Sequence, residues 1–280
     1  MNEFLKLMLL RAPYVPLIKA YFAKVQKDFD AFTAEVIPQL MNTQKSLSLS
    51  HLCGLYTISD LDTEKRSTLF RSTCFSSTLC KEVGRGFWSR ELGELNGVIL
   101  GALKRNEMWQ RDPFLLCLDR NRARVILDEQ LKRISSDKQD HYVETMLLDH
   151  GNHFLKFARA VLPSIFSMNV PELLSGLLRE RRAHIMGFLK EGNVVEESRP
   201  YIGELVCNRI LCPYIITLDP TPEVLCVMKS LTKFIQNCAS GVPFGGDKGD
   251  PVYENLNPLF DEFGPMYRAF IDTHSLKGSK

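Results

Sequence analysis

The segment TLFRSTCFSSTL, Thr68 to Leu79, places one arginine between an apolar pair and a group of small hydroxyl residues. A Leu-Phe pair precedes Arg71, and Ser72 or Thr73 can cap the helix that is expected to follow. A loop held at both ends in this way can project a permanently charged side chain away from the protein body. An ordinary surface arginine fits the same spacing, so this segment alone leaves both interpretations open.

A second arginine stands out in the segment YIGELVCNRILC. If successive side chains are about 100° apart, as in an α-helix, Arg209 falls near the centre of an apolar arc. That arc is formed by Ile202, Leu205, Val206 and Ile210. A guanidinium in such a place loses water and needs acceptors, from a carboxylate or from the backbone carbonyls of a neighbouring loop. The alternative is an arginine that extends its charged end to water from a helix terminus.

A polar stripe follows the segment from Val224 to Ser240. Apolar residues recur there every three or four positions, at Val224, Val227, Met228, Leu231, Phe234, Ile235 and Cys238, which predicts one buried helix face. Lys229, Lys233, Gln236 and Ser240 form the stripe opposite much of that face. A solvated surface explains the stripe, and so does a partner-binding surface.

Helical periodicity extends over nearly the whole chain, so the sequence predicts an all-α fold. Apolar residues recur at helical spacing within 75–87 and 174–189, and 114–162 lacks proline. Prolines, including Pro163 and Pro200, are interpreted as boundaries between helices. We expect an N-terminal helical extension over residues 1–42, a single elongated helical domain over 43–274 and a frayed tail over 275–280.

Composition excludes several classes of function. The 280 residues include 35 basic and 33 acidic ones, a formal net charge of +2, without long blocks of like charge. Binding to nucleic acid or directly to an anionic membrane is therefore not expected. The basic run from Arg179 to Arg182 is interpreted as a solvated helix face. No run approaches the roughly 18 apolar residues of a membrane span, so we expect a cytoplasmic protein without a transmembrane segment.

The cysteines and histidines give no sign of a metal site. Eight cysteines are scattered without a C-x-x-C pair and are interpreted as reduced, buried thiols. His150 and His153 can share a helix face, but a third ligand at diagnostic spacing is missing. The segment GGDKGD lacks the pattern of a phosphate-binding loop. Neither a metal nor a nucleotide of its own is expected for this chain.

Three blocks of the sequence occur in one order that resembles the Ras GTPase-activating protein (RasGAP) domain. TLFRSTCFSSTL resembles the finger-loop segment of that family, and NRILCPYIITLDP resembles its arginine segment before a C-P or N-P step. LTKFIQNCASGVPFGGDKGDPVYENLNPLF resembles its K-x-x-Q-N helix, F-G step and L-N-P. The blocks span Thr68 to about Asp272, and the family's fold is all-helical.

The resemblance implies that the chain acts on a GTP-loaded Ras-family small GTPase. Arg71 matches the arginine finger, which stabilises the negative charge that develops on the phosphate oxygens during GTP hydrolysis. Arg209 matches the second arginine, which holds the finger loop through its backbone. The chain would have no active site of its own and no cofactor, because the partner carries GTP and Mg²⁺. It could be recruited to the membrane where such GTPases reside.

The remaining expectations concern the partner-binding surface and its loops. The resemblance and the polar stripe together assign contact with the GTPase to Thr73, Asn208, Lys229, Lys233, Gln236 and Asn237. Loop-shaping roles fall to Phe70, Pro213, Phe244 and Asn257. Asn208 departs from the family's leucine, and the F-G-x-K-E-P-Y motif is stretched here. A weakly active or inactive GAP-fold module that binds a GTPase or another partner is the alternative, and a helical scaffold without a GTPase partner is a third.

Overall fold

The computed structural model describes residues 75–189, 192–245 and 251–276, and every regular element within them is a helix. The predicted all-α class is therefore confirmed. These residues divide into two compact units. In its described part, unit 1 comprises residues 75–90, 169–189, 192–210 and 271–276, and unit 2 comprises 91–168, 211–245 and 251–270. The single domain expected over residues 43–274 stays a prediction, and the expected boundary at residue 42 lies outside the described residues.

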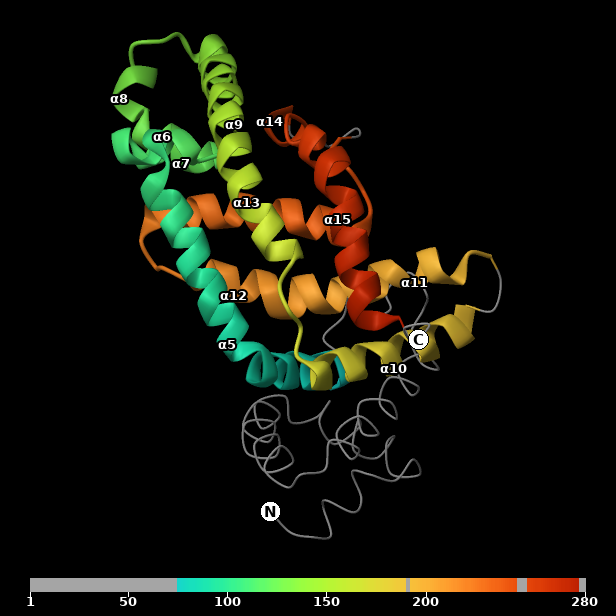
Figure 1. The fold of residues 1–280 in the computed structure, drawn as a ribbon. Helices are drawn as coiled ribbons and strands as arrows, with labels where there is room; N and C mark the ends of the chain where they lie inside the picture. The colour runs from blue at the N-terminus through green and yellow to red at the C-terminus, as the bar shows by residue number, and fades with distance from the viewer. Residues whose placement is uncertain (1–74, 190–191, 246–250, 277–280) are drawn as a thin grey trace. The chain divides into compact units, whose positions relative to one another are not determined.

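Unit 1 is built around the pair of helices α10 (Glu172–Leu189) and α11 (Val194–Gly203), which pack against each other (Figure 1). It also contains the beginning of α5 (Phe75–Arg105), most of η3 (Glu204–Leu211) and the end of α15 (Asn257–Ser275). The buried Trp88 of α5 donates from its indole nitrogen to the backbone oxygen of Asn169, at 2.9 Å. This bond fastens α5 to the segment that leads into α10.

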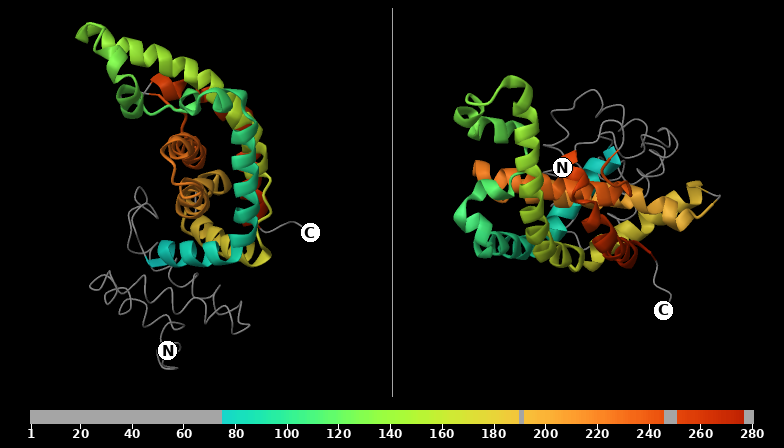
Figure 2. Two further views of the ribbon diagram at one scale, coloured as in Figure 1. Left: turned by 90° about the vertical axis from the view of Figure 1, so that its left-hand side faces the viewer. Right: turned by 90° about the horizontal axis from the view of Figure 1, so that it is seen from above.

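Unit 2 contains the remaining helices and parts of α5 and α15. In chain order its own elements are α6 (Glu107–Arg111), η2 (Pro113–Leu116), α7 (Arg120–Ile126), α8 (Asp128–Leu131), α9 (Ser136–Phe166), α12 (Cys212–Ile216), α13 (Pro222–Ser240) and α14 (Pro251–Glu254). The ribbon shows α9 running across α13 (Figures 1 and 2). The short helix η2 packs against both of them, and α12 packs against α13.

Side-chain caps explain where the short helices of unit 2 begin. Asn106 Oδ1 accepts the backbone N–H groups of Met108 and Trp109 at 3.0 and 3.1 Å, which starts α6. Asp112 and Asp119 cap η2 and α7 in the same manner. Each cap satisfies backbone donors that have no partner within the first helical turn. The capping residues therefore determine where the short helices α6, η2 and α7 begin, between the longer helices.

The core of unit 2 contains the apolar face of α13. All seven apolar residues predicted to share this face are buried, from Val224 to Cys238. In α10 the prediction is also confirmed for Leu174, Leu177, Leu178, Ile185 and Leu189, whereas Phe188 is 39% exposed. The 3,4 periodicity thus identified the buried faces of both helices.

Two expectations about helix boundaries are wrong. Pro163 lies inside α9 and Pro200 lies inside α11, so neither residue separates two helices. Ser275 was assigned to the tail, but it belongs to α15 and its side chain is buried. Its hydroxyl donates to the backbone oxygen of Ile271 at 2.6 Å.

Within the described residues, no helix is long and apolar enough to cross a membrane.

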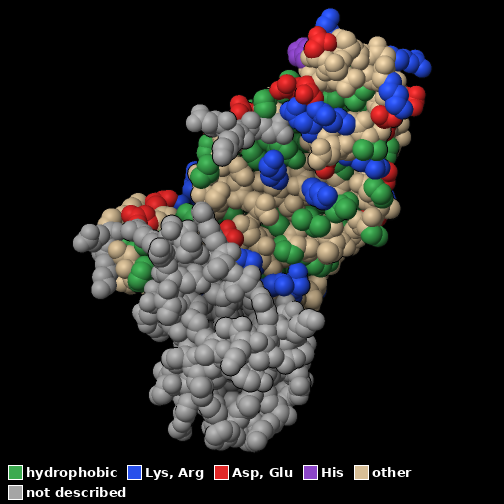
Figure 3. All heavy atoms as spheres, turned by 180° about the vertical axis from the view of Figure 1, so that it is seen from behind, with side chains coloured by type: hydrophobic (Ala, Val, Ile, Leu, Met, Phe, Trp, Pro, Cys, Tyr) green, Lys and Arg blue, Asp and Glu red, His purple; other side chains and the backbone are tan. Residues whose placement is uncertain are grey.

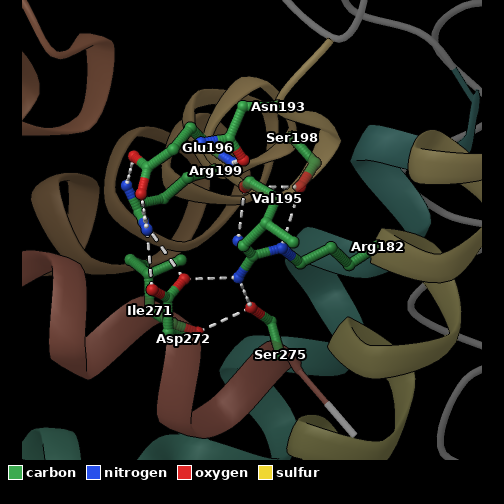
Figure 4. A network of polar contacts seen from close by, with 9 residues as sticks. All are labelled: Arg182, Asn193, Val195, Glu196, Ser198, Arg199, Ile271, Asp272 and Ser275. Atoms are coloured by element: carbon green, nitrogen blue, oxygen red, sulfur yellow. Dashed lines mark hydrogen bonds and ion pairs between the residues drawn. The ribbon is translucent and has the colours of Figure 1, made fainter. Parts of the chain in front are cut away.

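A buried ionic network joins α10, α11 and α15 within unit 1 (Figure 4). Arg182 has no exposed surface, and it donates to Asp272 and Ser275 at 2.7 Å, to the oxygen of Val195 at 2.8 Å and to Ser198 at 2.9 Å. Arg181 is buried as well. The interpretation of the basic run 179–182 as a solvated face is therefore wrong for its last two residues. Arg182 can be buried because it has acceptors on three sides.

Candidate partner-binding surface

The polar stripe of α13 lies at the surface of unit 2. Lys229 and Gln236 are exposed, and Lys233, Asn237 and Ser240 are half-buried. The helix ends at Gly241, whose positive φ of 70° forms a left-handed cap that an L side chain rarely adopts. Because the opposite face is buried throughout, α13 presents this stripe on a rigid support. The surface formed by Lys229, Lys233, Gln236 and Asn237 is called the α13 ridge below.

An aromatic ring lies under the central charge of the α13 ridge. Lys233 Nζ is 3.4 Å from the centroid of the Tyr253 ring in α14. A lysine ammonium within about 6 Å of an aromatic centroid is attracted by the electron-rich face of the ring. Tyr253 also contacts Phe244, with ring centroids 5.5 Å apart. The lysine is therefore held toward α14.

Asn257 braces the loop that follows α13. Its Oδ1 accepts from the backbone nitrogen of Phe244 at 2.9 Å, and its Nδ2 donates to the backbone oxygen of the same residue, also at 2.9 Å. A side-chain amide that pairs with both backbone groups of one residue fixes that residue as a strand neighbour would. Phe244 is itself buried. These contacts give Asn257 and Phe244 a structural role at the end of the α13 ridge.

Arg209 and Asn208 lie on η3, which is a π-helix. Its hydrogen bonds join residue i to residue i+5, so the α-helical spacing used to place Arg209 at the centre of an apolar arc does not apply here. Arg209 is half-buried and its Nε is enclosed by protein. π-Helical segments often coincide with functional sites because they redirect side chains. The angular argument for Arg209 is therefore wrong, and the need of its guanidinium for acceptors stays a prediction.

Asn208 is engaged by its own helix. Its Nδ2 donates to Glu204 Oε2 at 2.5 Å, and its Oδ1 is buried. A leucine at this position could not make the bond to Glu204. Pro213, four residues beyond Arg209, lies in the first turn of α12, where its missing N–H costs nothing.

The segment carrying Arg209 packs closely on the helix that follows the predicted finger loop. A Cβ atom on Gly84 of α5 would lie 2.3 Å from Cδ1 of Ile210, so only glycine leaves room for Ile210 in its present position. Both residues belong to unit 1. Arg71, Thr73 and Phe70 lie outside the described residues. The expected bonds between Arg209 and the backbone around Phe70 to Thr73 therefore remain a prediction.

The cysteine interpretation is wrong for two of the eight residues. Cys117, at the end of η2, forms a disulfide with Cys226 of α13, and the two are 109 positions apart in the sequence. Cys207, Cys212 and Cys238 are reduced thiols outside the disulfide and are buried, as predicted. Burial raises the pKa of the Cys238 thiol to about 12, so this cysteine stays protonated and unreactive at neutral pH.

His150 is a core residue of unit 2. It is 2% exposed, and its Nδ1 lies 3.1 Å from the backbone oxygen of Cys117, which can only accept, so Nδ1 carries the proton. Burial lowers the pKa of His150, because the charged imidazolium would lose its hydration, and this outweighs the carbonyl contact that favours the charged form. Within the described residues, no group of three or more His, Cys, Asp or Glu side chains could hold a metal ion.

Charged side chains of both signs occur on the face of the described residues that is seen from behind (Figure 3). Seen from behind, Lys and Arg side chains lie among hydrophobic side chains in the middle of the drawn surface, and the acidic side chains in view lie mainly toward its upper end and edges (Figure 3).

No model of a known protein family matches the chain, and comparison with curated proteins finds no similar sequence. The resemblance to RasGAP domains therefore depends on the three sequence blocks.

Sequence reasoning missed two features of the described residues. Tyr253 was noted only as part of a stretched motif, but its ring holds Lys233. Asp272 was not singled out, although it joins Arg182 and Arg199 through short bonds. A lone aspartate on a helix gives no sequence signal, because its partners lie 73 and 90 positions away.

Proposed function

We propose that this protein is a GTPase-activating protein for a Ras-family small GTPase. The observation that carries the proposal is the α13 ridge: polar and basic side chains stay at the surface of a helix whose opposite face is fully buried. A partner can bind such a ridge without reorganising the helix. Three of its residues, Lys233, Gln236 and Asn237, are the K-x-x-Q-N positions to which the RasGAP resemblance assigns contact with the GTPase.

The proposed chemistry takes place in the partner's active site. Arg71 would enter that site and donate from its planar, permanently charged guanidinium to the phosphate oxygens, where charge grows as the γ-phosphate leaves. The partner would supply GTP, Mg²⁺ and the attacking water. Arg209 would hold the finger loop through backbone carbonyls. The packing of Ile210 against Gly84 supports this role, because it brings the η3 segment against the helix that follows the loop.

A second candidate is a GAP-fold module that binds a small GTPase without accelerating hydrolysis. Asn208 favours it, because its side chain pairs with Glu204 of its own helix rather than offering the apolar surface of a leucine. Both candidates predict a binding surface at the α13 ridge. They differ in whether the finger loop is held in the geometry of the transition state.

Binding to nucleotide analogues separates the two candidates. The chain is titrated with Ras-family GTPases loaded with GDP, with a non-hydrolysable GTP analogue, or with GDP plus aluminium fluoride. A GAP binds the last form most tightly, because its contacts are strongest in the transition state. Equal affinity for the GTP-like and transition-state forms would support the binding module, and failure to bind any of the three would contradict both.

A further inference from the structure

Arg209 lies between two neighbours whose side chains are both fixed by contacts within unit 1. On its N-terminal side, Asn208 Nδ2 donates to Glu204 Oε2 at 2.5 Å. On its C-terminal side, Ile210 is buried and lies so close to Gly84 of α5 that a Cβ atom there would be 2.3 Å from its Cδ1. All five residues belong to unit 1. The backbone that carries Arg209 is therefore held from both directions.

Glu204 lies at the junction where α11 ends and η3 begins. Its backbone is still α-helical, with φ −54° and ψ −46°, and its N–H group donates to the carbonyls of Pro200 and Tyr201 in α11. Its side chain reaches forward to Asn208 within the π-helical segment. Glu204 also precedes Arg209 by five residues, the spacing of a π-helical hydrogen bond. One residue thus joins the α-helical part of the chain to the π-helical part that carries Arg209.

The bond between Glu204 and Asn208 has a carboxylate as its acceptor. Bonds of this kind are shorter and about twice as strong as those between neutral groups. Asn208 Oδ1 is enclosed by protein and has no hydrogen-bond partner within the described part of the chain, so the bond to Glu204 is what fixes its amide. Because π-helical turns are rare and are not the default of a helical chain, such a contact can decide whether the turn keeps its form.

We propose that Glu204 is a positioning residue that holds Arg209 in the direction from which it supports the finger loop. This inference rests on the proposed function, which gives that task to Arg209. The bond to Asn208 fixes the turn before the arginine, and Ile210 fixes the turn after it. A group that is held in its working geometry beforehand needs less reorganisation when the complex forms, and its contribution to the reaction is larger.

The first test measures the reactivity of Arg209 in the protein without a partner. A dicarbonyl reagent that modifies arginine is applied to the native chain, to Glu204→Ala and to Glu204→Gln, and each arginine is followed by mass spectrometry. Loss of the acceptor in Glu204→Ala should raise the rate at Arg209 about 3- to 10-fold, the range expected for one net hydrogen bond. Glu204→Gln keeps an acceptor oxygen and should stay close to the native rate.

Two other arginines separate a local effect from a general one. Arg133 is exposed and serves as the internal reference, and Arg182 is fully buried in unit 1 and reports loosening of that unit. Equal rates at Arg209 in the native chain and Glu204→Ala, or equal rises in the two variants, would overturn the positioning role. A rise at both Arg209 and Arg182 would also overturn it, because Glu204 would then act through the fold. These measurements need no GTPase, so they decide the positioning role whether or not the proposed function holds.

The second test asks whether this placement serves GTP hydrolysis. With a GTPase that the native chain stimulates, Glu204→Ala should lower the maximal single-turnover rate about 3- to 10-fold, and Glu204→Gln should restore most of it. Affinity for the GTP-loaded form should change by less than about 2-fold, because an interaction made mainly in the transition state contributes little to ground-state binding. In an Asn208→Ala background, Glu204→Ala should have no further effect, because both changes remove the same bond.

An equal loss of rate in both backgrounds would show that Glu204 acts through other contacts, and the proposal would be wrong. A loss confined to affinity would contradict it too, since a positioning role predicts an effect on the rate. Glu172→Ala is the control, because it removes an exposed carboxylate elsewhere in unit 1 and should leave rate and affinity unchanged. If the native chain stimulates no Ras-family GTPase, the proposed function fails and the role of Glu204 in hydrolysis fails with it.

Discussion

Asp272 is the residue on which the ionic network of unit 1 depends. Its carboxylate accepts from Arg182 at 2.7 Å and from Arg199 at 2.7 and 3.1 Å. Arg199 is also paired with Glu196, whereas Arg182 has Asp272 as its carboxylate partner among the described residues. Removing the carboxylate would leave a fully buried guanidinium without a counter-charge. Such a loss is more costly than the absence of the whole pair.

The change Asp272→Asn should lower the free energy of unfolding by about 3 kcal/mol, the usual cost of breaking a buried ion pair from one side. Asn keeps the size of the side chain and one acceptor oxygen but removes the charge. Chemical denaturation measures the effect. Asp261→Asn is the matched control, because Asp261 is exposed on the same helix and its loss should change stability by less than about 0.5 kcal/mol. Similar values for the two variants would contradict the role of the network.

The same residue predicts a dependence of stability on pH. Burial opposes ionisation of Asp272, but the hydrogen bonds from Arg199 and Arg182 outweigh it, so the pKa of this carboxyl is lowered from its ordinary value. Such a group stabilises the fold above the pKa of the unfolded chain, about 4, and the contribution is lost as pH falls through the folded pKa. The difference in Tm between native protein and Asp272→Asn should therefore shrink between pH 6 and pH 3, roughly the span of this titration. A difference that stays constant over this range would contradict the assignment.

Single residues show where sequence reasoning was limited. Arg181 and Arg182 occur in a charged run, and such a run is usually solvated. The burial of Arg182 depends on residues that the fold brings from far along the chain, such as Asp272. Lys229 and Gln236, by contrast, were correctly placed at the surface, because their positions follow from the apolar residues of their own helix.

At the scale of elements, α5 and η3 meet where Gly84 faces Ile210. Gly84 lets Ile210, the neighbour of Arg209, lie directly against the α5 backbone. The segment was expected to be α-helical, and its π-helical form could not be predicted from periodicity, because π-helical segments are rare and depend on their surroundings. The buried faces of α10 and α13 could be predicted, because each repeats over several turns.

The change Gly84→Leu should destabilise the fold by about 1–3 kcal/mol, because the new side chain would displace Ile210. It should also weaken any stimulation of a GTPase, since η3 carries Arg209. Gly93→Leu is the control on the same helix, because a Cβ atom at Gly93 meets nothing within 4 Å. Leucine favours a helix over glycine by about 0.5–1 kcal/mol, so the control should keep or gain stability in thermal unfolding. A Gly84 variant as stable as the control would show that Ile210 moves aside freely.

The disulfide between Cys117 and Cys226 should stabilise unit 2 by closing a loop of 109 positions. A cross-link over a loop of this length contributes about 4–5 kcal/mol in the chain-entropy model. We expect a reducing agent to lower the Tm of the native protein and of Cys238→Ala, which lacks only a free, buried thiol. Cys226→Ala should unfold at a lower temperature in either condition, with no further effect of the reductant. A native Tm that does not respond to reduction would contradict the disulfide.

At the scale of the whole molecule, the described helices form two compact units, and predicted site residues occur in both of them. Arg209 and Asn208 belong to unit 1, and the α13 ridge belongs to unit 2. The all-α class followed from helical periodicity alone. The division into units could not be predicted, because α5 and α15 each contribute to both units and no break in composition marks the boundaries.

Single-turnover hydrolysis of GTP tests the central proposal most directly. A panel of Ras-family GTPases is loaded with GTP, and phosphate release is followed with and without native protein, Arg71→Ala or Arg71→Lys. Arginine fingers accelerate hydrolysis by about 10³- to 10⁵-fold, so the native chain should give a rate gain of that order with at least one GTPase. Arg71→Ala should lose most of the gain while binding persists, and Arg71→Lys should not restore it, because lysine lacks the planar fork. Equal stimulation by native protein and Arg71→Ala, or none by native protein with any GTPase that it binds, would contradict the proposed mechanism.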